Sequence, residues 1–205
     1  MQALKTLIAA GTLGEIYHAR ATMTRRAGIP GYGSWFTNRE LAGAGALFDM
    51  GVHALDLGLY VMGFPRPLVV QGATYDVMGR RGRGLGRWGA DIIPGAGRFD
   101  VDDLASLMVH LEGAATLIVE AGWASYDLSV DSLTLLGTEA GARLIYGPNR
   151  GETDLRLFVD LPSGPAEIHP DYPWVESTYG ELIAAFSQRF APAAHRPSPS
   201  RRAWL

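Results

Sequence analysis

One stretch in the first half of the chain carries two carboxylates and an imidazole at regular spacing. Asp49, His53 and Asp56 follow one another at intervals of four and three residues within an apolar segment. Such intervals place side chains on one face of a helix. An imidazole beside a carboxylate can act as a general acid or base near neutral pH, while the carboxylate orients the ring or binds substrate hydroxyl groups. The same spacing is also typical of an ion pair on a helix surface, and both interpretations stay open.

The composition excludes several other kinds of chemistry. The 205 residues include no cysteine, which rules out disulfides, thiolate nucleophiles and cysteine-ligated metal centres. The aspartates and histidine of this stretch lack a further ligand at suitable spacing, so we predict no metal site. We also expect Asp100, Asp102 and Asp103 to lie in a solvated loop, because no EF-hand spacing follows them. The formal net charge of −3 argues against a nucleic-acid partner and favours a small neutral or weakly charged ligand.

Two motifs in a segment rich in arginine and glycine resemble functional motifs but lack the context those motifs need. Residues 84–89 satisfy G-x-G-x-x-G, yet Pro94 and further glycines follow where a dinucleotide site needs a helix. We therefore expect no cofactor there. The basic run at 80–83 could contact RNA, but Trp88 alone offers little surface for base stacking. We expect a solvated loop, with contact to substrate or to a second subunit as the alternative.

The elements that must position these residues follow from hydrophobic periodicity. Helical spacing from Leu4 to Ile8, followed by Gly11, predicts a first helix. The other predicted elements are a strand over 14–26, a loop over 27–44, a helix over 46–62, strands over 68–77, 104–111, 115–123, 132–136, 143–146 and 155–159, and a late amphipathic helix over 175–190. Hairpin-type turn signals between the later strands predict an antiparallel meander.

This order of elements favours an α+β fold, with an open, largely antiparallel mixed β-sheet and helices covering one face. We expect one domain over 1–192 and a flexible tail over 193–205. No apolar run is long enough to span a membrane, so we predict no membrane partner and a cytoplasmic protein. In the strands over 104–109 and 115–119, apolar residues occur at both odd and even positions, so both faces of the sheet carry them. Because helices can cover only one sheet face, we expect the other face to form a homo-oligomer.

Several motifs together resemble those of one enzyme family. The stretch from Trp35 to Gly63, with Asp49-Met50-Gly51-Val52-His53-Ala54-Leu55-Asp56 inside it, looks like the glycine-rich D-x-G-x-H-x-x-D segment of the Gfo/Idh/MocA oxidoreductases, the glucose-fructose oxidoreductase and inositol dehydrogenase group. Three further segments agree with that family in order: 11–16 with the start of its first substrate-domain strand, 137–141 with its G-T-x-G turn, and 181–186 with its late helix.

In that family an N-terminal Rossmann domain holds NAD or NADP, and a C-terminal α+β domain supplies the substrate pocket and an open sheet used for oligomerisation. The chain resembles the second domain only, with the N-terminal Rossmann domain absent. The family's Glu-Lys-Pro lysine also has no counterpart, because Lys5 is the only lysine and lacks that context. By position, the resemblance implies that His53 is the catalytic histidine and that Asp49 is a substrate-contacting aspartate in the catalytic site. Trp35 matches a substrate-binding loop position near the pocket.

The resemblance therefore implies the substrate-binding and oligomerisation portion of an NAD(P)-dependent oxidoreductase acting on a sugar, polyol or related hydroxyl or carbonyl substrate. We expect the chain alone to be inactive and to bind no NAD or NADP, with a separately encoded Rossmann domain as a candidate partner. The missing domain and lysine motif leave open whether the chain is itself an enzyme. A non-catalytic carbohydrate-binding or scaffold module and a truncated gene product are the alternatives.

Overall fold

The computed structural model of the chain describes residues 1–87, 97–146, 153–171 and 187. The turn expected near 148–151, nearly all of the late helix over 175–190 and the tail over 193–205 lie outside the described residues. Within the described part, no helix is long and apolar enough to cross a membrane.

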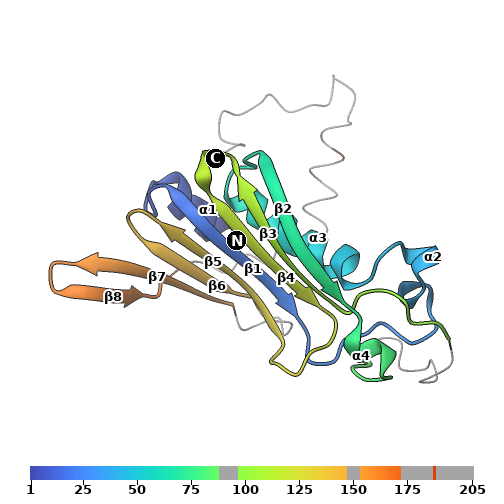
Figure 1. Cartoon of the computed structure of the whole chain (residues 1–205). Helices are drawn as coiled ribbons and strands as arrows, with labels where there is room; N and C mark the ends of the chain where they lie inside the picture. Colours follow the sequence, from blue (N-terminus) through green and yellow to red (C-terminus); the bar gives the residue numbers. More distant parts are fainter. Residues whose placement is uncertain (88–96, 147–152, 172–186, 188–205) are drawn as a thin grey trace.

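One eight-stranded sheet forms the framework, in the order β2-β3-β4-β1-β5-β6-β7-β8 (Figure 1). The strands are β1 (Ile16–Thr24), β2 (Pro67–Tyr75), β3 (Leu104–Leu111), β4 (Thr116–Gly122), β5 (Val130–Gly137), β6 (Gly141–Ile145), β7 (Asp154–Leu161) and β8 (Gly164–Ile168). Neighbouring strands are antiparallel except β1 and β4, which are parallel. The expected open, largely antiparallel mixed sheet of an α+β fold is confirmed.

Two features of the sheet differ from the prediction. The strands do not form a simple meander, because β1 lies between β4 and β5, with Ala21 opposite Val119 on one side and Leu133 on the other. Turn signals report only local neighbours, so they could not reveal this long-range insertion. Strand β8 was also not predicted, because Gly164 and Pro165 at its start interrupt the strand pattern.

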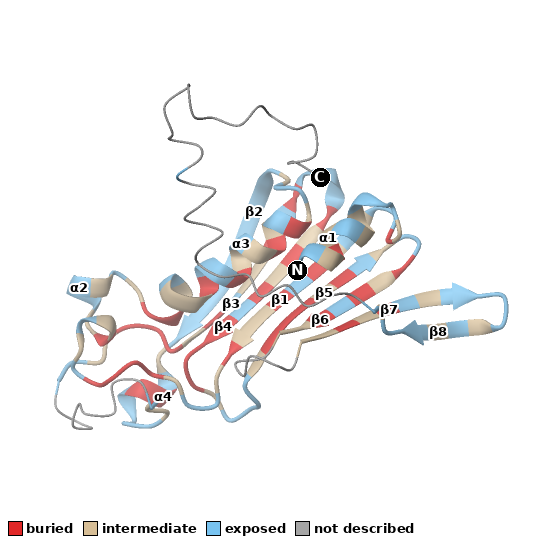
Figure 2. Cartoon of the chain, turned by 180° about the vertical axis from the view of Figure 1, so that it is seen from behind, coloured by how far each residue is buried: buried red, intermediate tan, exposed pale blue. Residues whose placement is uncertain are grey.

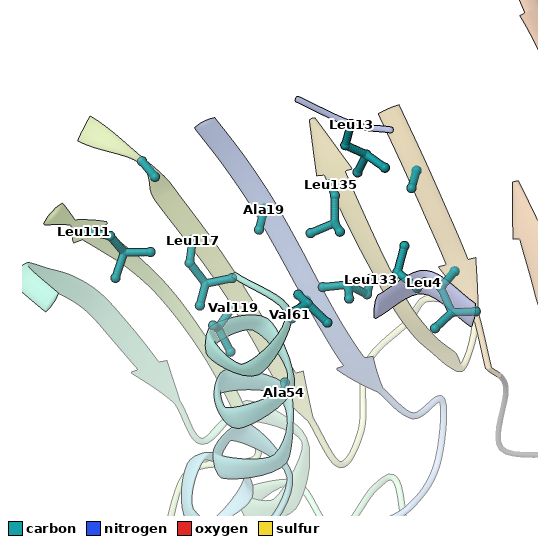
Figure 3. Packing of buried hydrophobic residues seen from close by; sticks show 14 of the residues in the cluster. Leu4, Leu13, Ala19, Ala54, Val61, Leu111, Leu117, Val119, Leu133 and Leu135 are labelled. Carbon is teal, nitrogen blue, oxygen red and sulfur yellow. The ribbon is translucent and has the colours of Figure 1, made fainter. Parts of the chain in front are cut away.

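Helices α1 (Gln2–Ala9) and α3 (Val52–Val61) cover one face of the sheet, which Figure 2 shows from that side. The core between these layers holds Leu4 of α1 and Val61 of α3, packed with buried residues of β1, β4 and β5 (Figure 3). A Cβ atom at Gly58 would lie 2.7 Å from Leu117 Cδ1, so this glycine lets α3 approach β4 closely. The helix on the first residues and the helix before Gly63 are therefore confirmed.

A second, smaller core supports the loops at one end of the sheet. It comprises Ile29, Tyr32, Ala46, Met78, Val101, Trp123 and Ala124. The segment predicted as an element-free loop over 27–44 contains a 3₁₀ turn at Trp35–Thr37 and the short helix α2 (Arg39–Ala42), and a further helix, α4 (Val77–Arg80), follows β2. These elements were not predicted because each has only three or four residues, too few for hydrophobic periodicity to show, and tertiary packing stabilises them instead.

Candidate functional site

Asp49 lies in a π-helical turn, Leu47–Gly51, that leads directly into α3. The predicted helix over 46–62 is therefore not a uniform α-helix. A π turn adds a residue to the turn, and such turns often occur at functional sites. Gly51 lies buried against β4, and a Cβ atom there would sit 3.5 Å from the Cβ of Ala121. The close approach holds the turn at the end of the sheet.

Asp102 fixes the start of this helical segment. Its carboxylate accepts hydrogen bonds from the backbone N–H of Gly45 at 2.8 Å and of Leu47 at 2.7 Å, and its carbonyl oxygen accepts one from Ala46 at 2.9 Å. A Cβ atom at Gly45 would lie 1.9 Å from that carbonyl oxygen, which explains the glycine. The free N–H groups at the start of a helix favour such a carboxylate.

The neighbouring aspartates have similar structural roles. Asp103 is buried and accepts the backbone N–H of Gly79, in α4, at 2.7 Å. Burial raises the pKa of Asp103, and the backbone N–H groups of α4 act in the opposite direction. Asp100 accepts the N–H of Arg39 at 2.8 Å. The prediction that Asp100, Asp102 and Asp103 form a solvated loop is therefore wrong, because all three cap short helical segments and two of them are buried.

The carboxylate of Asp49 is held by a buried tryptophan. Trp123 directly follows β4, is 1% exposed, and donates from Nε1 to Asp49 Oδ2 at 2.7 Å. Sequence reasoning missed this contact. The available signal was the tryptophan itself, since a buried indole N–H nearly always finds an acceptor. A donor fixed in the core orients one carboxylate oxygen and leaves Oδ1 for another partner.

Aromatic rings connect Trp123 to the predicted loop residue Trp35. The ring of Phe36 meets Trp123 edge to face, with centroids 6.5 Å apart. Trp35 stacks on Phe36 with centroids 3.8 Å apart and is 55% exposed. The structure thus links Trp35 to Asp49 through two intervening aromatic side chains. An exposed tryptophan face of this kind can stack on the apolar face of a sugar ring.

His53 and Asp56 lie exposed on α3. Within the described part of the chain, no hydrogen bond or ion pair joins the side chain of either residue to another residue, and Asp49 contacts Trp123 rather than His53. The structure therefore shows neither the helix-surface ion pair nor a carboxylate–imidazole hydrogen bond. His53 is instead available to a ligand or a partner at the same helix start. Among the described residues, no group of three or more acidic or histidine side chains could hold a metal ion.

Comparison with known proteins decides the family. Residues 1–143 match the family model described as the GFO/IDH/MocA C-terminal domain. The chain belongs to the Gfo/Idh/MocA family. Over 157 residues it is 34% identical to D-glucoside 3-dehydrogenase of Escherichia coli K12, an alignment that covers 74% of the chain and 43% of the relative. Over 189 residues it is 36% identical to a protein described as a UDP-kanosamine synthase oxidoreductase subunit of Amycolatopsis mediterranei S699, covering 90% of the chain and 52% of the relative.

Solved structures agree on the fold. An aldose-aldose oxidoreductase from Caulobacter crescentus, complexed with glycerol, superposes with a TM-score of 0.66 at 19% identity, over 90% of the chain and 48% of that protein. Levoglucosan dehydrogenase, complexed with NADH and levoglucosan, gives 0.64 at 24% identity, over 89% of the chain and 50% of that protein. The chain thus spans about half the length of its relatives and corresponds to their C-terminal domain.

One hollow of this Gfo/Idh/MocA domain lies away from Asp49. It has a volume of about 440 Å³ and is lined by residues that include Arg20, Thr22, Glu120, Thr134 and Arg143. Ala19 and Ala21 of β1 face the helices. Because side chains alternate along a strand, Arg20 and Thr22 point to the opposite, open face of the sheet, and the hollow that they line lies on that face. Asp49 and Trp123 do not line it. The hollow therefore belongs to the uncovered sheet face rather than to the candidate site.

Proposed function

We propose that this domain supplies the substrate site of an NAD(P)-dependent oxidoreductase, in which Asp49 binds a substrate hydroxyl group and His53 exchanges its proton. The fixed carboxylate is the observation that supports this most directly. Trp123 orients Oδ2 of Asp49 from the core, so Oδ1 can accept a hydroxyl hydrogen without a large ordering cost. The two curated relatives are named for a glucoside and a UDP-sugar, and the proposal covers sugars and polyols of either kind.

We propose that the dinucleotide binds to a Rossmann domain and not to this chain. Gly84 begins the G-x-G-x-x-G sequence, but Leu85 pairs with Ile29 in a short parallel bridge instead of opening a helix. Two steps therefore belong to this chain. Asp49 positions the substrate, and the imidazole of His53 takes the hydroxyl proton as a carbinol becomes a carbonyl, or returns it in the reverse direction. The hydride of the carbinol would pass to the nicotinamide that a Rossmann domain holds in the complete enzyme.

Sugar binding by the chain itself tests the role of Asp49. We expect methyl glucoside or a small polyol to bind weakly, and Asp49→Asn to reduce that affinity by about 10-fold or more, since it removes a hydrogen bond to a charged acceptor. Trp123→Phe should give a smaller loss, because the ring remains while the orienting N–H is gone. Ligand-observed NMR titration measures both, with NADH titrated in parallel and expected to show no saturable micromolar binding.

Asp56→Asn is the matched control, because Asp56 is an exposed carboxylate on the same helix. Its sugar affinity should equal that of the unmodified chain. Equal affinity in Asp49→Asn would contradict the assigned role.

We further propose that the open face of the sheet associates with a second copy of the chain. Met108 of β3 and Ile118 of β4 lie side by side on that face, and Leu136 and Phe158 are also exposed there. The described helices α1 and α3 cover the other face (Figure 2). Apolar side chains in an uncovered sheet favour a partner.

Light scattering at tens of micromolar should therefore report a dimer or a larger assembly. Ile118→Glu should shift the population toward monomer, because it places an unpaired charge in the buried interface. A monomeric unmodified chain under these conditions would show the association to be wrong.

A further inference from the structure

Two arginines meet on one exposed tyrosine at the same end of the sheet as Asp49. Tyr126 is 67% exposed, and the guanidinium carbon of Arg26 lies 4.9 Å from its ring centroid. Arg83 donates from Nη1 to the hydroxyl oxygen of Tyr126 at 2.6 Å. We name Arg26, Arg83 and Tyr126 the Tyr126 cluster. Arg26 therefore contacts the ring of Tyr126 and Arg83 its hydroxyl, although the two arginines are far apart in the sequence.

The surrounding backbone holds both arginines in place. Arg26 follows β1, and its backbone N–H donates to Ser129 Oγ at 2.9 Å. The carbonyl oxygen of Arg83 accepts the hydroxyl of Tyr32 at 2.5 Å, and Tyr32 belongs to the second core. The guanidinium of Arg26 also donates to the carbonyl oxygen of Ser125 at 3.1 Å. The backbone at both arginines is thus anchored to neighbouring segments, while the three side chains of the cluster lie exposed.

The charges of the cluster are uncompensated within the described residues. Arg26 and Arg83 form no ion pair there, whereas five other arginines pair with carboxylates: Arg25, Arg66, Arg80, Arg98 and Arg156. The adjacent carboxylate of Asp127 accepts the backbone N–H of Leu128 at 2.7 Å. Each guanidinium has five N–H donors, and the hydrogen bonds described use one on each side chain. Most donors of the cluster remain free for an anion.

The chain path places the cluster near the candidate site. Tyr126 comes three residues after Trp123, which limits the separation of their Cα atoms to about 11 Å. Gly84, next to Arg83, packs so closely on Ala124 that a Cβ atom there would lie 2.3 Å from the Cβ of Ala124. A ligand on the Tyr126 cluster would therefore lie at the end of the sheet where Asp49 is held.

We propose that the Tyr126 cluster binds the phosphate of a phosphorylated ligand, either a sugar phosphate or a nucleoside diphosphate. The planar fork of a guanidinium matches two phosphate oxygens, and arginine holds such groups better than lysine does. The hydroxyl of Tyr126 accepts from Arg83 and keeps its own hydrogen to donate to a third oxygen. This anion site is separate from the sugar site proposed at Asp49.

Calorimetric titration of the chain with inorganic phosphate, glucose 1-phosphate and UDP tests the proposal. We expect glucose 1-phosphate or UDP to bind, and Arg83→Gln and Arg26→Gln each to weaken binding by about 10-fold or more, as expected for a lost charged hydrogen bond. Competition by inorganic phosphate would show that the phosphate group itself is recognised. Preference for UDP over glucose 1-phosphate would identify a nucleotide as the source, and the reverse would identify a sugar phosphate.

Arg81→Gln is the matched control, because it removes the same charge from the same exposed loop without touching Tyr126. Its affinity should stay within about 2-fold, and Asp49→Asn should leave UDP binding within the same limit, since separate sites act independently. An equal loss in Arg81→Gln would show diffuse charge attraction and overturn the proposal. Absence of binding at millimolar UDP and glucose 1-phosphate would overturn it as well, whatever the outcome for Asp49 and uncharged sugars.

Discussion

His53→Asn should lower kcat by about 10²- to 10⁴-fold in the complete enzyme, formed by joining this domain to a Rossmann domain or adding one in trans. Asparagine retains polarity but cannot exchange a proton near neutral pH, so the loss falls on the proton-transfer step. The dinucleotide affinity of the complete enzyme should barely change. His53 is exposed and its side chain has no hydrogen bond within the described residues, so the thermal midpoint should also stay close to that of the unmodified protein.

Steady-state kinetics for His53→Asn, with Asp56→Asn as control, separate the two interpretations of this helix face. Asp56 lies three residues further along α3 and is also exposed, so its variant should keep both kcat and KM. A His53→Asn enzyme with unchanged kcat would refute the proton-transfer role. It would leave the domain as a module that binds sugars without taking part in the chemistry.

Asp102→Ala should destabilise the domain by about 2 to 4 kcal/mol, because two backbone N–H groups at the start of the π turn, one buried and one partly buried, lose their acceptor. The carboxylate accepts from Gly45 and Leu47 at 2.8 and 2.7 Å, and the side chain is buried. Loss of these bonds should also loosen Asp49 and its contact with Trp123. Urea unfolding, followed by tryptophan fluorescence, measures the stability change directly.

Asp102→Asn provides the graded comparison. The amide oxygen can still accept one N–H, whereas the amide nitrogen cannot accept the other, so the loss should lie between those of the unmodified chain and Asp102→Ala. The same order is expected for sugar affinity, since the capped residues Gly45 and Leu47 precede Asp49 by only a few positions. Equal stability in all three proteins would mean that water replaces the carboxylate and that Asp102 does not fix the turn.

Much of the fold was accessible from local sequence pattern. The apolar periodicity before Gly63 predicted the helix that carries His53, and the runs at β3 and β4 predicted those strands almost to the residue. The insertion of β1 between β4 and β5 was not accessible, because it depends on pairing between distant segments. The π turn was also missed, since its apolar spacing differs too little from that of an α-helix over one turn.

The candidate site was only partly predictable for a related reason. Asp49 and His53 stood out by residue type and by their resemblance to a family motif. Trp123 and Asp102 did not, because each acts on a segment more than fifty positions away, through a contact that only the folded chain creates. Acidic residues in a short run resemble a solvated loop unless the helix ends that need capping are known to be near.

The central position of β1 has a consequence for how the protein is made. Ile16–Thr24 leaves the ribosome before both of its neighbours, which begin only at Thr116 and Val130. At about 5 to 20 residues per second, translation of roughly 100 residues keeps this strand waiting for about 5 to 20 s. Its apolar side, including Ala21 and Met23, has no sheet partner during that time. A strand made before its two neighbours therefore joins the sheet late, and non-local pairing of this kind slows folding and exposes the segment to misassembly.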